Sequence, residues 1–430
     1  MNVKCFFTVF FLFCAGNAFS QQILTLKQCK TTALENNLRA QNSRLATQAA
    51  RQVKKEAFTK YFPSINATGL YFRADKPILE TSLLGMIQIS MLETGLIGAV
   101  TVIQPVFTGG QIYYGNKLAQ TGVEAGLLQE KMTDDEIMLQ TEQYFWQVVS
   151  LAEKMKTIAE SDSMLQNIYK DVQIAVEAGV VNQSELLKVE LEQNKLQSLK
   201  MKVQNGAKQY KLLLGHTIGV PSDSFDIDKT LPEEVVNPAN IRATHEDALM
   251  QRAEYQLLSK DIDASRLKMK MKQGELLPNV AIGGAYNSFS LDKGKTFATD
   301  NQFGIAMVTV SVPVTDWWGG SRSVKKQKIE MTIAQNKLQE NSDLLLIQMQ
   351  QLWNELEEAS QQVELAAKSI EVAKENLRLS TDYYQAGTAI LSDLLDAQIL
   401  LRQSYDQRTD ALTAYHIKLS RYKQATGNND

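Results

Sequence analysis

Two stretches of the chain, IQPVFTGGQIYYGNK (Ile103–Lys117) and VPVTDWWGGSRSVKKQK (Val312–Lys328), repeat one pattern that decides the fold. Each begins with an apolar run typical of a strand, passes through a proline and a Gly-Gly pair, and ends in a sequence that favours a helix. A single Gly-Gly pair would indicate only a loop. Because Gly109–Gly110 and Gly319–Gly320 occupy equivalent places, we expect both pairs to turn a strand into a helix with one shared geometry.

The repetition extends well beyond these two stretches. Ala33–Leu34 recurs as Ala248–Leu249, and Tyr61–Pro63 recurs as Leu276–Pro278 with the same displacement. Self-similarity on this scale indicates two copies of one structural unit. The sequence therefore predicts a signal peptide (1–20), repeat 1 (21–215), an inter-repeat linker (216–240) and repeat 2 (241–430).

Proline positions separate the predicted helices from the predicted strands, because a proline inside a helix costs about 3 kcal/mol. Four prolines mark junctions between helices and strands: Pro63, Pro105, Pro278 and Pro313. Residues 106–220 and 314–430 contain no proline and carry apolar residues at helical spacing. We expect a helix from Gly110 to about Glu177, roughly 100 Å long, and a return helix from about Asn182 to Leu214. Such a rod needs neighbouring helices along its length.

Two hairpins, at about 63–107 and 278–314, lie between the prolines. Their predicted strands are Pro63–Arg73, Leu96–Phe107, Pro278–Phe289 and Phe303–Val314. Each has about the 9 to 11 residues that a tilted strand needs to cross a bilayer, and the first strand of each pair alternates apolar with polar residues. An extension of the first hairpin through Gln88–Leu92 is left open. The expected fold class is mainly α with transmembrane β, arranged in two tandem repeats with four strands per chain.

The N-terminus and the composition indicate an exported protein. Lys4, the apolar run Cys5–Ala15 and the small-residue site Ala18–Ser20 are typical of a signal peptide. A membrane anchor is the alternative, but a spanning helix needs about 20 apolar residues. Only Cys29 would remain in the mature chain, which excludes an intramolecular disulfide and a cysteine-based zinc cluster. A net charge of −3 argues against nucleic-acid binding.

Four strands cannot close a barrel, and an open sheet edge cannot face lipid because its backbone groups would lack partners. Membrane insertion would therefore require several copies of the chain. Two copies would give eight strands, whose interior side chains would largely fill, whereas three would give twelve and room for a lumen. We expect three.

The twofold repeat, the proline-bounded strand pairs, PVFTGG, PVTDWWGG and the glycine-containing helical turns together resemble the TolC family of outer-membrane efflux proteins. The resemblance covers essentially the whole mature chain. It implies a homotrimer with a twelve-stranded β-barrel in the bacterial outer membrane, continuous with a long periplasmic α-helical barrel. It also implies a passive exit duct of a tripartite efflux or type I secretion system, working with a periplasmic adaptor and an inner-membrane pump.

The resemblance is closest at the second helical turn, YYQAGTAILSDLLDAQ, Tyr383–Gln398. It implies that acidic residues six and nine positions after the glycine, here Asp393 and Asp396, form rings around a periplasmic aperture. Three copies of each would create a negative field that favours cations. The alternative is that Ser392 and Asp393 merely start the helix, as capping residues and first-turn acids do.

The resemblance also implies polar contacts that hold the aperture closed, and Tyr384 and Glu185 fit two of the positions involved. The basic partner expected two positions after the glycine is Ala389, so this chain departs from the family pattern there. Gly179 and Gly387 occupy the turns where the resemblance places adaptor docking. Relief of a tight helix-to-helix turn is their ordinary structural role.

An enzyme is the first competing function, and the sequence contains no HExxH, GxSxG or Walker pattern. We therefore expect no catalytic residues, no cofactor and no metal site. An exported coiled-coil scaffold or adhesin without a pore is the second alternative, but it leaves the paired strands of membrane-spanning length unexplained. Whether a duct would carry drugs, metals or proteins is left open.

Overall fold

The computed structural model describes residues 22–427 apart from 77–78, 84–86, 92–93 and 294–296, so the predicted signal peptide lies outside the described residues. The chain forms two compact units. Unit 1 comprises residues 22–41, 134–243 and 349–427, and unit 2 comprises residues 42–133 and 244–348. Each unit takes segments from both sequence repeats, so a repeat is not a compact unit.

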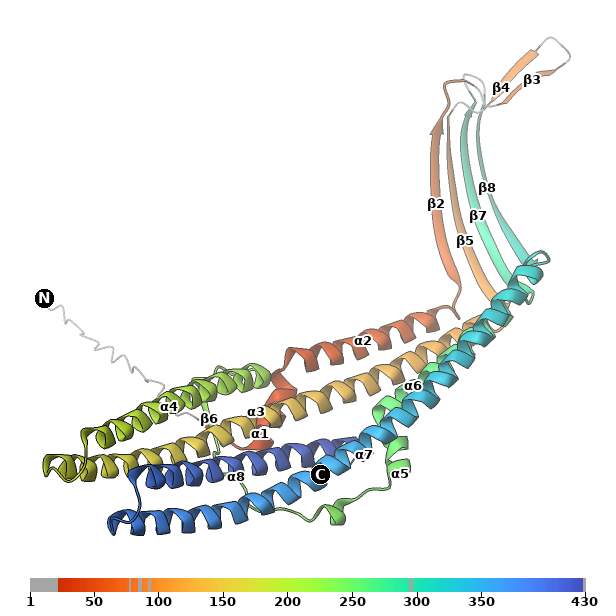
Figure 1. Cartoon of the computed structure of the whole chain (residues 1–430). Helices are drawn as coiled ribbons and strands as arrows, with labels where there is room; N and C mark the ends of the chain where they lie inside the picture. The colour runs from red at the N-terminus through yellow and green to blue at the C-terminus, as the bar shows by residue number, and fades with distance from the viewer. Residues whose placement is uncertain (1–21, 77–78, 84–86, 92–93, 294–296, 428–430) are drawn as a thin grey trace, which may run out of the picture. The chain divides into compact units, whose positions relative to one another are not determined.

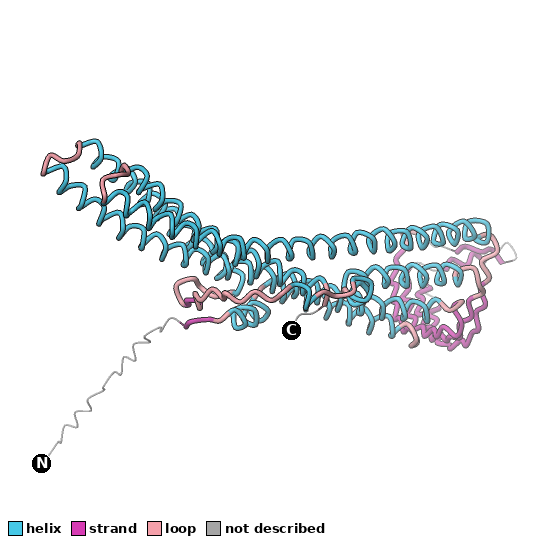
Figure 2. The backbone as a smooth tube through the Cα atoms, turned by 60° about the horizontal axis from the view of Figure 1, so that its bottom comes forward, coloured by secondary structure: helices cyan, strands magenta, loops and turns pink. Residues whose placement is uncertain are grey.

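Unit 1 is built from long helices that pack along their lengths. It contains α1 (Leu26–Asn36), α4 (Gln183–Ile218), α8 (Leu391–Ala425) and the later parts of α3 (Gln111–Glu177) and α7 (Asp316–Gln385). The α3–α4 and α7–α8 turns lie at the same end of this unit (Figures 1 and 2). Buried Leu, Ile and Val side chains from α3, α4, α7 and α8 form the core near that end. No helix in the described residues is long and apolar enough to span a membrane.

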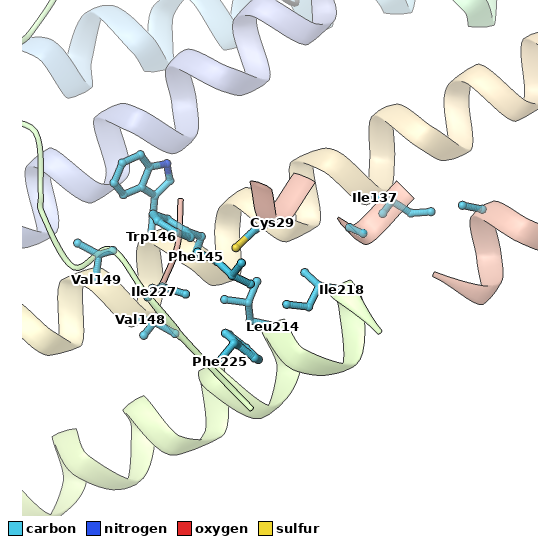
Figure 3. Close-up of a cluster of buried hydrophobic side chains, with 13 residues drawn as sticks. Cys29, Ile137, Phe145, Trp146, Val148, Val149, Leu214, Ile218, Phe225 and Ile227 are labelled. Carbon is cyan, nitrogen blue, oxygen red and sulfur yellow. The ribbon is translucent and has the colours of Figure 1, made fainter. Parts of the chain in front are cut away.

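A second core in unit 1 surrounds Cys29 (Figure 3). Strand β1 (Gln22–Leu24) pairs in parallel with β6 (Phe225–Ile227), and this small sheet packs with α1, α3 and α4. Cys29 is 0% exposed. Burial raises the pKa of its thiol to about 11, so the thiol stays protonated and unreactive at neutral pH.

The stretch between the repeats follows a fixed path over unit 1. It contains the end of α4, β6 and the start of the short helix η1 (Pro238–Ile241). The hydroxyl of Tyr415 accepts from the backbone nitrogen of Val236 at 2.9 Å, and that of Tyr422 accepts from the nitrogen of Ala243 at 3.0 Å. Both tyrosines are buried on α8. They satisfy backbone groups that no regular structure pairs.

Unit 2 contains a four-stranded antiparallel sheet together with α2 (Leu38–Thr59), α5 (His245–Gln251), α6 (Ala253–Gly274) and the early parts of α3 and α7. The sheet strands lie side by side in the order β2 (Ser64–Arg73), β5 (Thr94–Thr108), β7 (Asn279–Lys293) and β8 (Phe297–Ser311) (Figure 1). The pairing of β5 with β7 joins the two repeats. The mainly α fold class with four sheet strands is confirmed.

The strand ends differ from those predicted. Strand β8 begins at Phe297 rather than Phe303, because backbone pairing with β7 continues past the end of the clear apolar pattern. Residues 88–91 fall in β4 (Ile87–Met91), which pairs with β3 (Leu79–Leu83) in a separate two-stranded sheet. They do not lengthen β2 or β5, and Leu92 lies outside the described residues.

The two Gly-Gly pairs do not share one geometry, so that prediction is wrong. Gly109 and Gly110 have φ values of 61° and 82°, in the left-handed region that favours glycine. Gly319 and Gly320 instead lie within α7, which begins earlier at Asp316. In the second repeat the turn is made by residues 312–315, directly after β8 ends, so the glycines come too late to form it.

Close packing explains why glycine occurs at two of these positions. A Cβ on Gly109 would lie 2.1 Å from the carbonyl oxygen of Gly274, at the end of α6, and a Cβ on Gly320 would lie 2.1 Å from Cδ2 of Leu276. The first contact is with backbone and the second with a side chain that can move. Gly109 and Gly274 therefore fix how closely the two repeats approach at the helix end of the sheet.

Candidate functional site

The two helical turns of unit 1 have the same local geometry. Gly179 and Gly387 have φ values of 73° and 74°, and each ends its helix in the left-handed conformation. The nitrogens of Val180 and Thr388 donate to carbonyls five residues earlier, both at 2.9 Å. A Cβ on either glycine would meet nothing within 4 Å. The glycines are thus required by backbone conformation, and the turns are open to a partner.

Asp393 and Asp396 lie on the exposed face of the first turns of α8, while Leu391, Leu394 and Leu395 are buried on the other face. The N-cap residue of α8 is Ile390, and it makes no side-chain capping bond. Asp393 lies in the first turn, where the helix dipole favours an acid. Stabilisation by the helix dipole explains the acid at Asp393, but it does not explain the second exposed acid at Asp396.

Glu185 and Tyr384 come close to each other at the same end of unit 1. Tyr384 is half-buried. Burial raises the pKa of its hydroxyl, and the negative charges of Glu185 and Asp171 raise that pKa further. The Oε2 atom of Glu185 is buried and accepts no hydrogen bond from any described residue. Burying a carboxylate oxygen without a hydrogen-bond donor costs folding free energy, so the side chain of Glu185 is sensitive to any change in its surroundings.

Lys188 is a residue that the sequence analysis missed. Its Nζ donates to Oε1 of Glu185 at 2.9 Å and to Oγ of Ser392 at 3.4 Å, so it links α4 of repeat 1 to α8 of repeat 2. The spacing of three residues between Glu185 and Lys188 predicts the pair within α4. The contact with Ser392 depends on how the helices pack and has no signal in the sequence. Lys188 thus supplies a basic group that contacts Ser392, three residues after Ala389 in the sequence.

The two faces of the sheet in unit 2 differ in composition. One, here called the apolar face, carries mostly apolar side chains that register places together: Ile65, Ala67, Gly69, Tyr71, Leu96, Gly98, Val100, Val102, Ile282, Gly284, Tyr286, Gly304, Ala306, Val308 and Val310. Polar residues on this face lie at Arg73, Thr94, Gln104, Ser288, Ser290 and Gln302. The other, here called the mixed face, includes Ser64, Asn66, Thr68, Thr101, Asn287 and Thr309 among apolar residues. Such a contrast is typical of a sheet with lipid on one side and water on the other.

Side-chain exposure shows which face is convex. On the central strands, apolar-face residues such as Leu96 and Tyr286 are 55% and 53% exposed. Their mixed-face neighbours Ile97, Ala285 and Phe289 are half-buried. Side chains on the inside of a curved sheet crowd one another, so the mixed face is the concave one.

Two tryptophans begin α7 near the helix end of the sheet. Trp317 donates from its indole nitrogen to the carbonyl oxygen of Leu276 at 3.0 Å, and Trp318 is 83% exposed. The sequence predicts an interfacial position for both, with core packing as the alternative. The exposure of Trp318 within the described residues favours the interfacial position, where amphipathic rings are common.

Residues 244–428 match the model of the family described as outer membrane efflux protein. No curated protein matches the chain. The described part of the chain also contains no group of three or more His, Cys, Asp or Glu side chains placed to hold a metal.

Solved structures similar to this chain include the outer-membrane channel OprN, with a TM-score of 0.79 and 13% identity over 94% of this chain and 90% of that one. The Campylobacter jejuni CmeC outer membrane channel gives a TM-score of 0.77 and 14% identity over 94% and 86% of the two chains. The open state of the Neisseria gonorrhoeae MtrE outer membrane channel gives 0.75 and 14% over 94% and 89%. The fold is therefore that of these channels across both repeats.

Proposed function

We propose that the chain is the outer-membrane exit duct of a tripartite efflux or type I secretion system, because residues 244–428 match the outer membrane efflux protein family and the fold is that of outer-membrane channels. The observation that carries this proposal is the two-faced sheet of unit 2, with its convex apolar face and its concave mixed face. A convex apolar face suits contact with lipid, and a concave face with polar groups suits a water-filled lumen.

The proposed duct is a homotrimer. In the described sheet, β2 and β8 each pair with one strand only, so both are edges. An edge in lipid needs a partner for its backbone groups. If β8 of each copy pairs with β2 of the next, three copies close a ring of twelve strands with cyclic symmetry.

The proposed periplasmic aperture lies at the turn end of unit 1. There the exposed carboxylates of Asp393 and Asp396, repeated three times, would attract cations. The link from Glu185 through Lys188 to Ser392 joins the helix pair α3–α4 to the helix pair α7–α8. We assign to Lys188 the closing role that a basic residue at position 389 would otherwise have, with Tyr384 close to its partner Glu185.

Partners follow from the same arrangement. The open turns at Gly179 and Gly387 are the proposed docking points of a periplasmic adaptor. Energy for transport would come from an inner-membrane pump, because this chain carries no nucleotide-binding signature. Members of the family serve drug, metal or protein export, and the choice among these substrates is left open.

A scaffold or adhesin without a pore is the second candidate, favoured only by the length of α3 and α7, 67 and 70 residues. Fractionation separates the two. A scaffold is released as soluble protein on lysis, whereas the proposed barrel stays with the outer membrane until detergent is added.

The experiment that tests the aperture is a reversal-potential measurement on purified protein in a planar bilayer under a salt gradient. We expect cation selectivity in the wild type and a marked loss of it in Asp393→Asn/Asp396→Asn, which keeps size and removes charge. The charge-matched control is Glu357→Gln/Glu358→Gln on α7, away from the turn, and it should retain cation selectivity. Equal cation selectivity in the wild type and both variants would show that Asp393 and Asp396 do not form the selective rings, and it would leave the proposal of a duct unaffected.

A further inference from the structure

Three helices of unit 2 each place an exposed aromatic side chain where the helix meets the sheet (Figure 1). Phe58 lies at the end of α2, just before β2, while Tyr113 and Trp318 lie in the first turns of α3 and α7, just after β5 and β8. Their side chains are 55%, 50% and 83% exposed. Register places these three strand ends at the same end of the sheet. Exposed rings gathered there indicate a surface that contacts something other than water.

A cation accompanies each of these rings, about one helical turn further from the sheet. The three pairs, here called the aromatic–cation belt, are Phe58 with Lys55, Tyr113 with Lys117, and Trp318 with Arg322. The members of each pair are three or four residues apart, which puts both side chains on one face of the helix. In the second pair, Nζ of Lys117 lies 4.7 Å from the ring centroid of Tyr113.

The three cations of the belt are available to a ligand. All are exposed, and none forms an ion pair with an acid in the described part of the chain. The neighbouring sequence on α7, α6 and α2 is basic as well: residues 317–328 and 264–272 each hold four cations and no acid, and residues 51–60 hold four cations and one acid. Because the whole chain has a net charge of −3, this positive surplus is a local feature of the helix ends beside the sheet.

The order of groups along each helix matches the cross-section of a lipid leaflet. From the sheet outward, the apolar side chains proposed to face lipid come first, the aromatic ring second and the cation third. Aromatic rings favour the headgroup level of a membrane, and basic side chains next to the membrane attract anionic lipids. An anionic substrate in the lumen would need the cations, but it would not need exposed rings between the cations and the apolar sheet.

We propose that the aromatic–cation belt binds the headgroups of anionic phospholipids in the leaflet next to the helices, with the cations at the level of the phosphates. Bound headgroups would also neutralise positive charges that otherwise repel one another. This inference rests on the proposed lipid-facing barrel, and it adds a preference of that barrel for one class of lipid.

The belt contains its own reporter, Trp318. Purified trimers are reconstituted into phosphatidylcholine bilayers that contain either brominated phosphatidylglycerol or brominated phosphatidylcholine. Bromine quenches tryptophan fluorescence at short range, so the two quenching curves give the relative affinity of the anionic lipid for the surface near Trp318. Trp146 and Trp353 are each only 6% exposed and add a background that is the same in every variant.

Three variants separate the charge of the belt from its shape and from the net charge of the chain. Lys55→Gln/Lys117→Gln/Arg322→Gln removes the cations. Lys55→Arg/Lys117→Arg/Arg322→Lys keeps them, and it controls for folding. The matched control for net charge changes three exposed lysines of α3 and α4 away from the sheet, Lys170→Gln/Lys202→Gln/Lys208→Gln.

We expect the wild type to prefer phosphatidylglycerol over phosphatidylcholine by about fivefold, the ratio that one basic side chain at a membrane surface gives. The preference should fall to nearly equal affinities when the three cations are removed, and it should stay within about twofold of the wild-type value in the other two variants.

The outcomes separate the belt from the barrel. Equal quenching of the wild type by the two brominated lipids would overturn the anionic preference and leave the barrel in lipid. A preference that survives removal of the three cations would overturn their assignment. If neither lipid quenches any of the proteins, Trp318 does not lie at the lipid boundary, and the proposed lipid-facing barrel fails together with the belt.

Discussion

The sharpest stability prediction concerns Gly109→Ala at the junction between β5 and α3. Two physical effects act together there. A φ of 61° is left-handed, which costs a residue with a Cβ about 1–2 kcal/mol. The new Cβ would also meet the carbonyl oxygen of Gly274 at 2.1 Å, and overpacking of this kind typically costs about 1–3 kcal/mol. The expected destabilisation is therefore about 2–5 kcal/mol.

Gly319→Ala is the matched control in the second repeat. Gly319 is helical, and a Cβ there meets nothing within 4 Å. Alanine favours a helix over glycine by about 0.5–1 kcal/mol, so this variant should be as stable as the wild type or slightly more so. Thermal unfolding of the purified proteins, followed by far-ultraviolet circular dichroism, measures both. Equal melting temperatures for Gly109→Ala and the wild type would refute the reasoning, as would equal losses in the two variants.

Three further predictions concern unit 1. Lys188→Met breaks the link to Ser392, and at about 0.5 kcal/mol per exposed pair and three pairs per trimer the resting conductance should rise about tenfold. The control Lys195→Met breaks a similar pair within α4 and should change the conductance little. Equal conductances of the two variants would show that Lys188 does not help to close the aperture. Cys29, with its pKa raised to about 11, should react with iodoacetamide at about pH 8, below that pKa, only after unfolding, and rapid reaction in the folded protein would contradict its burial. Tyr415→Phe removes the acceptor for the backbone nitrogen of Val236 and should lower stability by about 1–2 kcal/mol in denaturant titrations; an unchanged midpoint would show that the linker is held by other contacts.

Much of the architecture could be read from the sequence, because it depends on local rules. The proline-free stretches form α3 and α4 within a few residues of the expected ends. Turn glycines such as Gly387 are recognisable because few other residues adopt a left-handed backbone. Strand alternation predicted where β2 and β7 begin to within one residue, because side-chain direction along a strand has a period of two, but β7 continues four residues past the predicted end.

The features that sequence reasoning missed depend on tertiary packing. Gly319 and Gly320 repeat the pattern of Gly109 and Gly110, yet α7 begins before them, and no local rule fixes where a helix starts after a loop without a strong cap. The contact between Lys188 and Ser392 joins residues 204 positions apart. Likewise, the pairing of β5 with β7 joins strands from different repeats, and its register is fixed only in the folded sheet.

The central claim is that the chain forms a continuous water-filled duct, and single-channel current through purified trimers in a planar bilayer tests it most directly. The most informative protein is Lys188→Met, which removes the proposed closing contact with Ser392. We predict a stable, large conductance that exceeds the wild-type value and scales with salt concentration. Silence from correctly inserted trimers of this variant would contradict the duct, because the proposed closing contact would no longer be present to explain it.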